Sequence, residues 1–266
     1  MKAVFDDVSL AYDDTGSGPA VVLLHGFPFN RQLWRPQARA LAKAGYRVVT
    51  PDLRGFGEST LGDGIAGIKT FADDLLALLD YLGIGRAVIG GMSMGGYVVL
   101  EFLARYPRRC AAALLMVTRA GADDAAGRER RTALAARARQ QGAAPVAAAF
   151  ETVLFDEHTP AARPELVSQV RDWMLATPAE TLAAALEAMR DRSDFHSRLA
   201  EFTCPALVLG AAGDRTIPVE ESRRMAAALP AGTVRILPDG GHLVNLEEPA
   251  SVNETLLEFL RNLSCQ

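Results

Sequence analysis

Short apolar runs recur along the chain between longer stretches of mixed polarity. From residue 20 onward most of these runs are continuous, which is typical of parallel strands that are covered on both faces. The first two runs instead alternate apolar and polar positions, and a turn-like connection joins them, so we expect an antiparallel edge. The predicted strands are 3–5, 8–12, 20–24, 47–50, 87–90, 112–117, 206–211 and 233–237.

Between these runs, apolar residues recur at helical spacing. One helix is expected to have Thr70 as its N-cap, and its apolar face runs from Phe71 to Leu82. Pro249 is expected to open the last helix, with an apolar face that reaches Leu260. Strands that alternate with helices predict an α/β fold with a mostly parallel eight-stranded sheet flanked by helices.

Residues 119–200 break this alternation. They contain no convincing strand, alanine is frequent, and glycine or proline separates helical stretches at 125–141, 144–154, 164–175 and 178–190. Large side chains such as Phe150 and Trp173 give the stretch something to bury. We therefore predict a helical cap at 119–200, inserted between two strands of a core domain formed by 1–118 and 201–266.

Composition excludes several classes of protein. At 266 residues and 49% hydrophobic content, the chain is long enough for one large domain with an insertion. A formal net charge of −4 without a basic footprint argues against nucleic-acid binding. No apolar run approaches the ~18 residues of a membrane span, and no secretory signal is visible. Three widely spaced cysteines, Cys110, Cys204 and Cys265, favour a reducing compartment, so we expect a cytoplasmic protein.

The segment Gly91-Met92-Ser93-Met94-Gly95 matches G-x-S-x-G and lies between a predicted strand and a predicted helix. A sharp turn of this kind presents its central side chain in a strained backbone conformation. Only small residues two positions to either side let the strand and the helix approach each other. Ser93 is therefore the candidate nucleophile, although a glycine-rich turn with an idle serine gives the same pattern.

A serine hydroxyl needs a base to take its proton. His242 follows the last predicted strand in a glycine-rich loop, and we choose it over His25, which precedes Gly26 in a tight loop. Asp214 follows the strand 206–211 and is the candidate acid that orients the base. Asp239 is closer to His242 in sequence, but we interpret it as a turn residue. Asp123 is a weaker alternative for the acid.

Backbone N–H groups are the candidates for stabilising an oxyanion. The N–H of Met94 directly follows the nucleophile, and the N–H of Phe27 lies in the loop after the strand 20–24. Pro28 cannot donate. His25 is then interpreted as a structural loop residue, and 52–59 as an ordered loop with local ion pairs.

Five motifs together carry a resemblance to a known family: HGFP at 25–28, DLRGFGES at 52–59, GMSMGG at 91–96, GDRTIP at 213–218 and GGH at 240–242. In this order they resemble the α/β-hydrolase superfamily over nearly the whole chain except the cap. Within it the chain is similar to the serine carboxylesterase, enol-lactonase and cofactor-free haloperoxidase-like branch. The resemblance implies an α/β-hydrolase fold, a triad of Ser93, Asp214 and His242 in that chain order, and a cap that lines the substrate pocket.

These residues favour acyl transfer. A serine nucleophile excludes dehalogenase and epoxide hydrolase chemistry, because attack would leave an inert ether. We expect a carboxylic ester hydrolase that acts on a small or medium ester through an acyl-enzyme. A lactonase of the enol-lactone type, a perhydrolase and a ligand receptor that retains the pocket are the alternatives.

The expected partner is a small-molecule ester or lactone, with no nucleic acid and no membrane. Neither a dinucleotide turn nor a His/Cys metal cluster is visible, so no cofactor and no metal are expected. The oligomeric state cannot be deduced from the pattern. Predicted substrate contacts are Phe29, Trp34, Met92 and Leu243.

Overall fold

A computed structural model of the chain describes residues 1–263. The eight strands form one sheet in the order β1-β2-β4-β3-β5-β6-β7-β8. β2 (Ser9–Thr15) runs antiparallel to β1 (Lys2–Val4) and β4 (Arg47–Pro51), and every other pairing is parallel. The remaining strands are β3 (Ala20–Leu24), β5 (Ala87–Met92), β6 (Cys110–Met116), β7 (Ala206–Ala211) and β8 (Gly232–Leu237). The predicted fold class is therefore confirmed, including the antiparallel edge.

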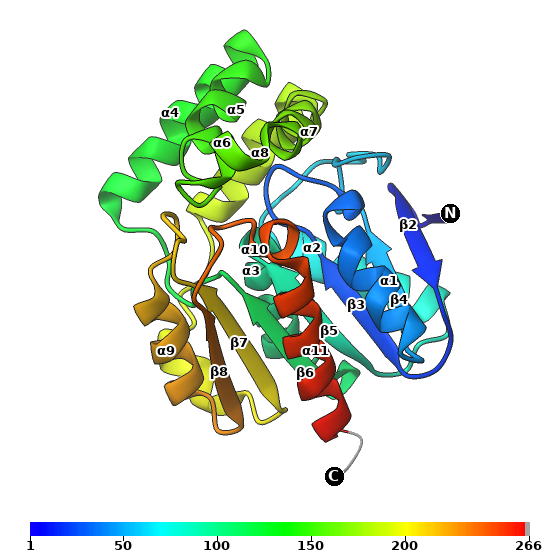
Figure 1. Cartoon of the computed structure of the whole chain (residues 1–266). Helices are drawn as coiled ribbons and strands as arrows, with labels where there is room; N and C mark the ends of the chain where they lie inside the picture. Colours follow the sequence, from blue (N-terminus) through cyan, green and yellow to red (C-terminus); the bar gives the residue numbers. More distant parts are fainter. Residues whose placement is uncertain (264–266) are drawn as a thin grey trace.

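Both faces of the inner strands β3 to β7 are buried, as their continuous apolar runs predict, whereas the edge strand β8 is largely exposed. Along β3, Val21 and Leu23 join one hydrophobic cluster, and Val22 and Leu24 join the other. Figure 1 shows α1 (Arg35–Lys43) and α11 (Pro249–Leu263) on the near side of the sheet, where they belong to the first of these clusters. The opposite cluster contains residues of α2 (Ile68–Tyr81), α3 (Met94–Arg105) and α9 (Val219–Ala228).

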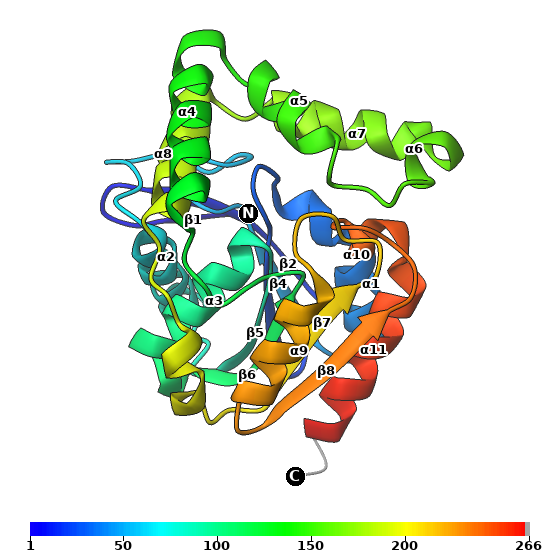
Figure 2. The ribbon, with the colours of Figure 1, turned by 90° about the vertical axis from the view of Figure 1, so that its left-hand side faces the viewer.

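The segment between β6 and β7 is helical. Residues 119–200, all of which the structure describes, contain no strand, and Figure 2 shows α4 to α8 together beyond the carboxyl ends of the strands. Alanines such as Ala135 of α4 and Ala185 of α8 are fully buried, so these two helices pack with short side chains between them. The elements are α4 (Ala125–Gln141), α5 (Ala144–Glu151), α6 (Thr159–Ala162), α7 (Pro164–Leu175), α8 (Ala179–Arg190) and the 3₁₀ turn η3 (His196–Glu201).

The predicted N-cap at Thr70 is wrong. Helix α2 begins two residues earlier, at Ile68, and its N-cap is Gly67. The reason is burial: the Ile68 side chain is almost fully buried in the same cluster as Phe71 and Leu75, which extends the apolar face backwards by one turn. Packing thus outweighs the capping tendency of threonine.

Three short elements complete the fold. These are the 3₁₀ turns η1 (Arg31–Trp34) and η2 (Pro107–Arg109) and the helix α10 (Val244–Glu247). Cys110 and Cys204 are free thiols, and Cys110 Sγ donates to the carbonyl oxygen of Ala112 at 3.2 Å. Cys265 lies outside the described residues.

One buried carboxylate ties the helical segment to the loop after β8. Glu247, at the end of α10, accepts hydrogen bonds from the N–H groups of Gly241 at 2.9 Å and Asp156 at 2.8 Å. It also accepts one from the Thr159 hydroxyl at 2.6 Å. A single side chain therefore fixes the loop 238–243 against the chain between α5 and α6.

We predict that Glu247→Gln lowers the free energy of unfolding by about 1–3 kcal/mol, because an amide cannot accept all three hydrogen bonds and leaves a buried donor unpaired. Urea unfolding measures the change. Glu258→Gln is the matched control, since Glu258 forms an exposed ion pair with Arg235, which is worth at most about 1 kcal/mol. Equal losses in the two variants would contradict the role given to Glu247.

Candidate active site

Ser93 lies at the turn between β5 and α3 with φ 53° and ψ −113°. Such a conformation is costly for a residue with a side chain and persists only where its surroundings hold it. Here the Ser93 N–H donates to the carbonyl oxygen of Met116 at 3.0 Å, and the Thr118 hydroxyl donates to the Ser93 carbonyl oxygen at 2.8 Å. The end of β6 thus stabilises the strained turn.

Two glycines flank this turn where backbones meet. A Cβ atom at Gly91 would overlap the backbone of Gly95, and one at Gly95 would overlap the carbonyl oxygens of Leu24 and His25. Any side chain at either position would therefore push α3 away from β5 or from the loop after β3. The predicted requirement for small residues on both sides of Ser93 agrees with this geometry.

The predicted acid and base are adjacent in space. His242 Nδ1 donates a hydrogen bond to Asp214 Oδ2 at 2.9 Å, and both side chains are almost completely buried. Asp214 Oδ1 accepts from the N–H groups of Thr216 at 2.7 Å and Ile217 at 3.0 Å. The carboxylate is thus held by its own loop and leaves its other oxygen for the imidazole.

Ser93, Asp214 and His242 follow β5, β7 and β8, so all three lie at the carboxyl edge of the sheet. The Asp214–His242 pair is joined directly. Within residues 1–263, no hydrogen bond joins Ser93 to His242. A complete triad would therefore also need a hydrogen bond between Ser93 Oγ and His242 Nε2.

Ser93 opens into a cavity of about 880 Å³ between the sheet edge and the helical segment. This volume is in the range of small-molecule sites. Aromatic and aliphatic side chains from both sides surround the serine. They include Phe27, Tyr97, Phe150, Leu186 and Met189.

The two predicted oxyanion donors lie on either side of Ser93. Met94 is the first residue of α3, where N–H groups have no partner within the helix. Gly26 lies so close to the turn that a Cβ atom there would be 3.4 Å from Ser93 Cβ, which brings the loop containing Phe27 beside it. Among the described residues, neither the Phe27 nor the Met94 N–H donates a hydrogen bond.

His25 is fully engaged in its loop. Its Nδ1 donates to the Gly26 carbonyl oxygen at 2.9 Å, and its Nε2 accepts from the Leu53 N–H at 2.9 Å. Burial lowers the pKa of this imidazole, which favours the neutral ring that the two bonds require. Both ring nitrogens are thus occupied, in agreement with its interpretation as a structural residue.

The other candidate acids are placed elsewhere. Asp239 is exposed, and Asp214 rather than Asp239 contacts the imidazole. Asp123 pairs with Arg192 at 2.8 Å and with Arg131. Burial raises the pKa of Asp123, but these two guanidinium groups outweigh it and hold the pKa below its ordinary value. This carboxylate is therefore already neutralised.

The four residues predicted as substrate contacts do not line this cavity. Phe29, Trp34, Met92 and Leu243 are all buried in the hydrophobic cluster on the α1 and α11 side of the sheet. The described lining of the cavity comes instead from 27, 93, 97, the helical segment and four residues between 216 and 224. The sequence analysis chose these residues because they are large, apolar and close to strand ends. Their side chains point to the sheet face that α1 and α11 cover, so they belong to the hydrophobic core.

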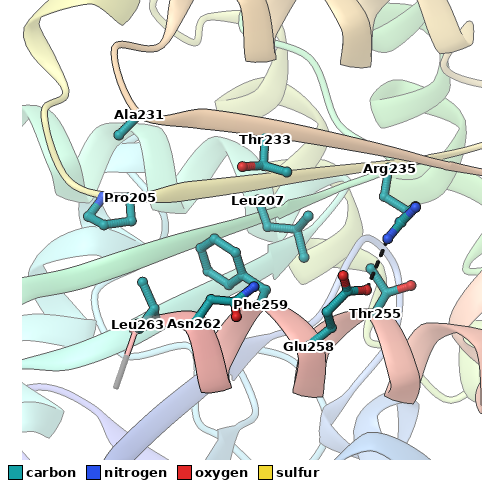
Figure 3. Close-up of a pocket in the computed structure, with 10 residues that line it drawn as sticks. All are labelled: Pro205, Leu207, Ala231, Thr233, Arg235, Thr255, Glu258, Phe259, Asn262 and Leu263. Atoms are coloured by element: carbon teal, nitrogen blue, oxygen red, sulfur yellow. Dashed lines mark hydrogen bonds and ion pairs between the residues drawn. The ribbon is translucent and has the colours of Figure 1, made fainter. Parts of the chain in front are cut away.

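A second cavity, of about 490 Å³, lies between β8 and α11 (Figure 3). Its hydroxyls are those of Thr233 and Thr255, and its charged pair, Arg235 and Glu258, is joined at 2.9 Å. No histidine lines it among the described residues. It therefore lacks the nucleophile–base combination found at the sheet edge.

Sequence reasoning missed three residues at the site: Thr118, Arg119 and Glu247. Thr118 stabilises the turn at Ser93, Arg119 lines the cavity, and Glu247 fixes the loop of His242. The only feature of the sequence that could have identified them is their position in the chain. Thr118 and Arg119 come after the predicted strand 112–117, and Glu247 comes five residues after the candidate base His242. No local pattern separates such residues from ordinary surface polar residues.

No helix among residues 1–263 is sufficiently long and apolar to span a bilayer. In the same range, no three His, Cys, Asp or Glu side chains are grouped in a way that could hold a metal ion.

Comparison with known proteins agrees with this geometry. Residues 19–249 match the family described as alpha/beta hydrolase fold. A thermophilic esterase from Thermogutta terrifontis is 39% identical, with a TM-score of 0.93, and the match covers 96% of this chain and 94% of the esterase. An enol-lactonase from Burkholderia xenovorans is 28% identical, with a TM-score of 0.90 and coverage of 98% and 100%. A bromoperoxidase from Bacillus anthracis is also 28% identical, with a TM-score of 0.86 and coverage of 96% of both chains.

The family match spans most of the chain, and the three solved structures cover almost all of it. They represent the three kinds of enzyme that the sequence motifs resembled. The chain therefore belongs to the alpha/beta hydrolase fold family, in the branch that contains esterases, enol-lactonases and bromoperoxidases.

Proposed function

We propose that the protein is a serine hydrolase that cleaves small or medium carboxylic esters through an acyl-enzyme. The observation that carries the proposal is the strained turn of Ser93, which opens into a cavity at the carboxyl edge of the sheet, the same edge at which the His242–Asp214 pair lies. Esterases among its structural neighbours support the same reaction class. This assigns Ser93, His242 and Asp214 as a catalytic triad.

In the proposed reaction, Ser93 Oγ attacks the ester carbonyl while His242 Nε2 takes its proton. The Asp214 carboxylate, bound at Nδ1, fixes the tautomer that leaves Nε2 free to accept and stabilises the imidazolium that forms. The imidazolium then protonates the leaving alkoxide, and water attacks the acyl-enzyme by the same route. Catalytic hydrogen bonds often tighten only with substrate bound, so the Ser93–His242 bond is assigned to that complex.

The N–H groups of Phe27 and Met94 form the proposed oxyanion hole. Their place beside Ser93 and the absence of hydrogen bonds to them within residues 1–263 support this role. Each such donor contributes about 3 kcal/mol of transition-state stabilisation in enzymes of this kind.

We further propose that residues 119–200 act as a cap domain on a core formed by 1–118 and 201–266. The helices of this segment lie beyond the sheet edge and supply much of the cavity wall above Ser93. A cap of this kind excludes water from the acyl group and sets the size of substrate that enters.

Lactone hydrolysis is the second candidate, because enol-lactonases from Burkholderia xenovorans and Acinetobacter baylyi are among the relatives. A lactone is a cyclic ester and needs the same nucleophile, base and oxyanion hole. Comparing kcat/KM on phenyl acetate and on γ- and δ-lactones of similar size decides between them. Higher kcat/KM on the aryl ester supports an esterase.

Replacing Ser93 with alanine is expected to lower kcat for 4-nitrophenyl acetate by about 10⁴-fold or more, because the nucleophile is lost. A fluorophosphonate probe should label the parent protein at Ser93 and leave the variant unlabelled. Ser168→Ala, which removes an exposed hydroxyl from α7, is the matched control and should retain labelling. Parent-level turnover by the alanine variant would overturn the proposal.

Asp214→Asn is expected to lower kcat by about 10³–10⁴-fold while the fold is kept, because an amide can donate to Nδ1 and then favours the wrong imidazole tautomer. Circular dichroism and steady-state kinetics on the same ester check both parts. The matched control is Asp239→Asn, which changes an exposed carboxylate three residues from His242 and should leave kcat within about twofold. Similar losses in the two variants would remove Asp214 from the triad.

A further inference from the structure

The cavity in front of Ser93 is apolar around the serine and charged further out. Most of the charged groups on its wall come from the helical segment and from α9. Four are guanidinium groups and three are carboxylates: Arg119, Arg130, Arg131 and Arg224, with Asp123, Asp124 and Glu221. The positive groups therefore outnumber the negative ones on a wall that faces the proposed nucleophile.

Two of the three carboxylates on this wall accept hydrogen bonds from other groups, whereas Glu221 Oε2 is buried without a hydrogen bond and lies 3.5 Å from His196 Nε2. Asp123 is held between Arg131 and Arg192, of which Arg192 lies just behind the wall. Asp124 is the N-cap of α4 and accepts from the Gly127 N–H at 2.7 Å. Asp123 is therefore paired with two guanidinium groups, and Asp124 is engaged at the start of α4.

The arginine side chains on this wall differ in the hydrogen-bond and ion-pair partners that they have. Arg224 lies 3.4 Å from Glu221, and Arg130 is exposed to solvent. Arg119 is half-buried, and its Nη2 donates to the Thr216 carbonyl oxygen at 3.3 Å. Its Nε is completely buried and has no hydrogen-bond partner, and no carboxylate among the described residues pairs with its guanidinium. A buried donor without a partner is uncommon and points to a missing acceptor.

Arg119 also occupies a special place in the chain. It directly follows Thr118, whose hydroxyl donates to the Ser93 carbonyl oxygen. Its other neighbour in space, Thr216, belongs to the loop that holds Asp214, since the Thr216 N–H donates to that carboxylate. The side chain therefore leaves the backbone beside the serine turn and reaches across to the loop of the proposed acid.

We propose that Arg119 binds a carboxylate of the substrate, so that the enzyme prefers esters or lactones that carry an acid group on their acyl or alcohol part. This inference rests on the proposed ester hydrolysis and names its substrate class. Guanidinium matches a carboxylate through paired N–H donors. Apolar neighbours such as Phe150 and Ile217 on the same wall lower the local dielectric and strengthen the pair.

Two pairs of esters test the preference, each differing only by a methyl cap on the acid. 4-Nitrophenyl hydrogen adipate and 4-nitrophenyl methyl adipate place the charge on the acyl side. 4-Acetoxybenzoate and methyl 4-acetoxybenzoate place it on the alcohol side. We expect the parent enzyme to have the higher kcat/KM on the acid of at least one pair.

The variant Arg119→Gln is then expected to lower kcat/KM about 10- to 100-fold on that acid, as loss of a charged hydrogen bond implies, mainly through KM. Its kcat/KM on the methyl-capped ester should stay within about threefold. Arg119→Lys keeps the charge but not the paired donors, so an intermediate loss is expected. Arg130→Gln is the matched control: it removes an exposed cation from the same wall and should change the acid-to-ester ratio by less than about threefold.

Two outcomes overturn the inference. If Arg119→Gln lowers kcat equally on both members of each pair, Arg119 merely positions the loop of Thr216 and Asp214. If the parent prefers neither acid, no carboxylate is recognised, and hydrolysis of the capped esters then leaves the proposed function intact. Turnover of none of the four esters, together with no fluorophosphonate labelling of Ser93, overturns the proposed function itself.

Discussion

The close approach of three backbones at the turn after β5 is the constraint on which the site depends. Gly91 and Gly95 leave no room for a side chain between β5, α3 and the loop after β3. That contact forces Ser93 into a positive φ, and the strain is held by hydrogen bonds from the end of β6. Because the same contact brings the Phe27 loop beside Met94, one packing constraint sets both the proposed nucleophile and its proposed oxyanion donors.

The second half of the site depends on the sheet in another way. Asp214 and His242 follow neighbouring strands, β7 and β8, so parallel pairing alone brings their loops together. The glycine-rich loop of His242 has little stability of its own, and Glu247 fixes it against the start of α6. The helical segment thus contributes to the site twice: it lines the cavity, and it restrains the loop that carries the proposed base.

Much of this arrangement could be predicted from the sequence, and the limits have physical causes. Apolar runs identified all eight strands: most of those from residue 20 onward are continuous, as parallel strands covered on both faces require, whereas the first two alternate. The positions of the proposed triad followed from strand ends, since parallel strands share one carboxyl edge. Thr70 failed as an N-cap because burial of Ile68 extended α2. Contacts such as those of Arg119 with Thr216 join residues far apart in the chain, and no local pattern encodes them.

The alanine-rich helical segment has a consequence for specificity. α4 and α8 pack through short side chains such as Ala138 and Ala183, so their backbones lie close together and form a stiff pair. Their few large residues, among them Leu134 and Leu186, then project into the cavity and define its apolar roof. Arg131, which extends from the same pair of helices, is held by Asp123 and so has a fixed position. In the proposed reaction, a handful of aliphatic side chains would limit substrate size, and Arg119, which has no carboxylate partner among the described residues, would recognise substrate charge.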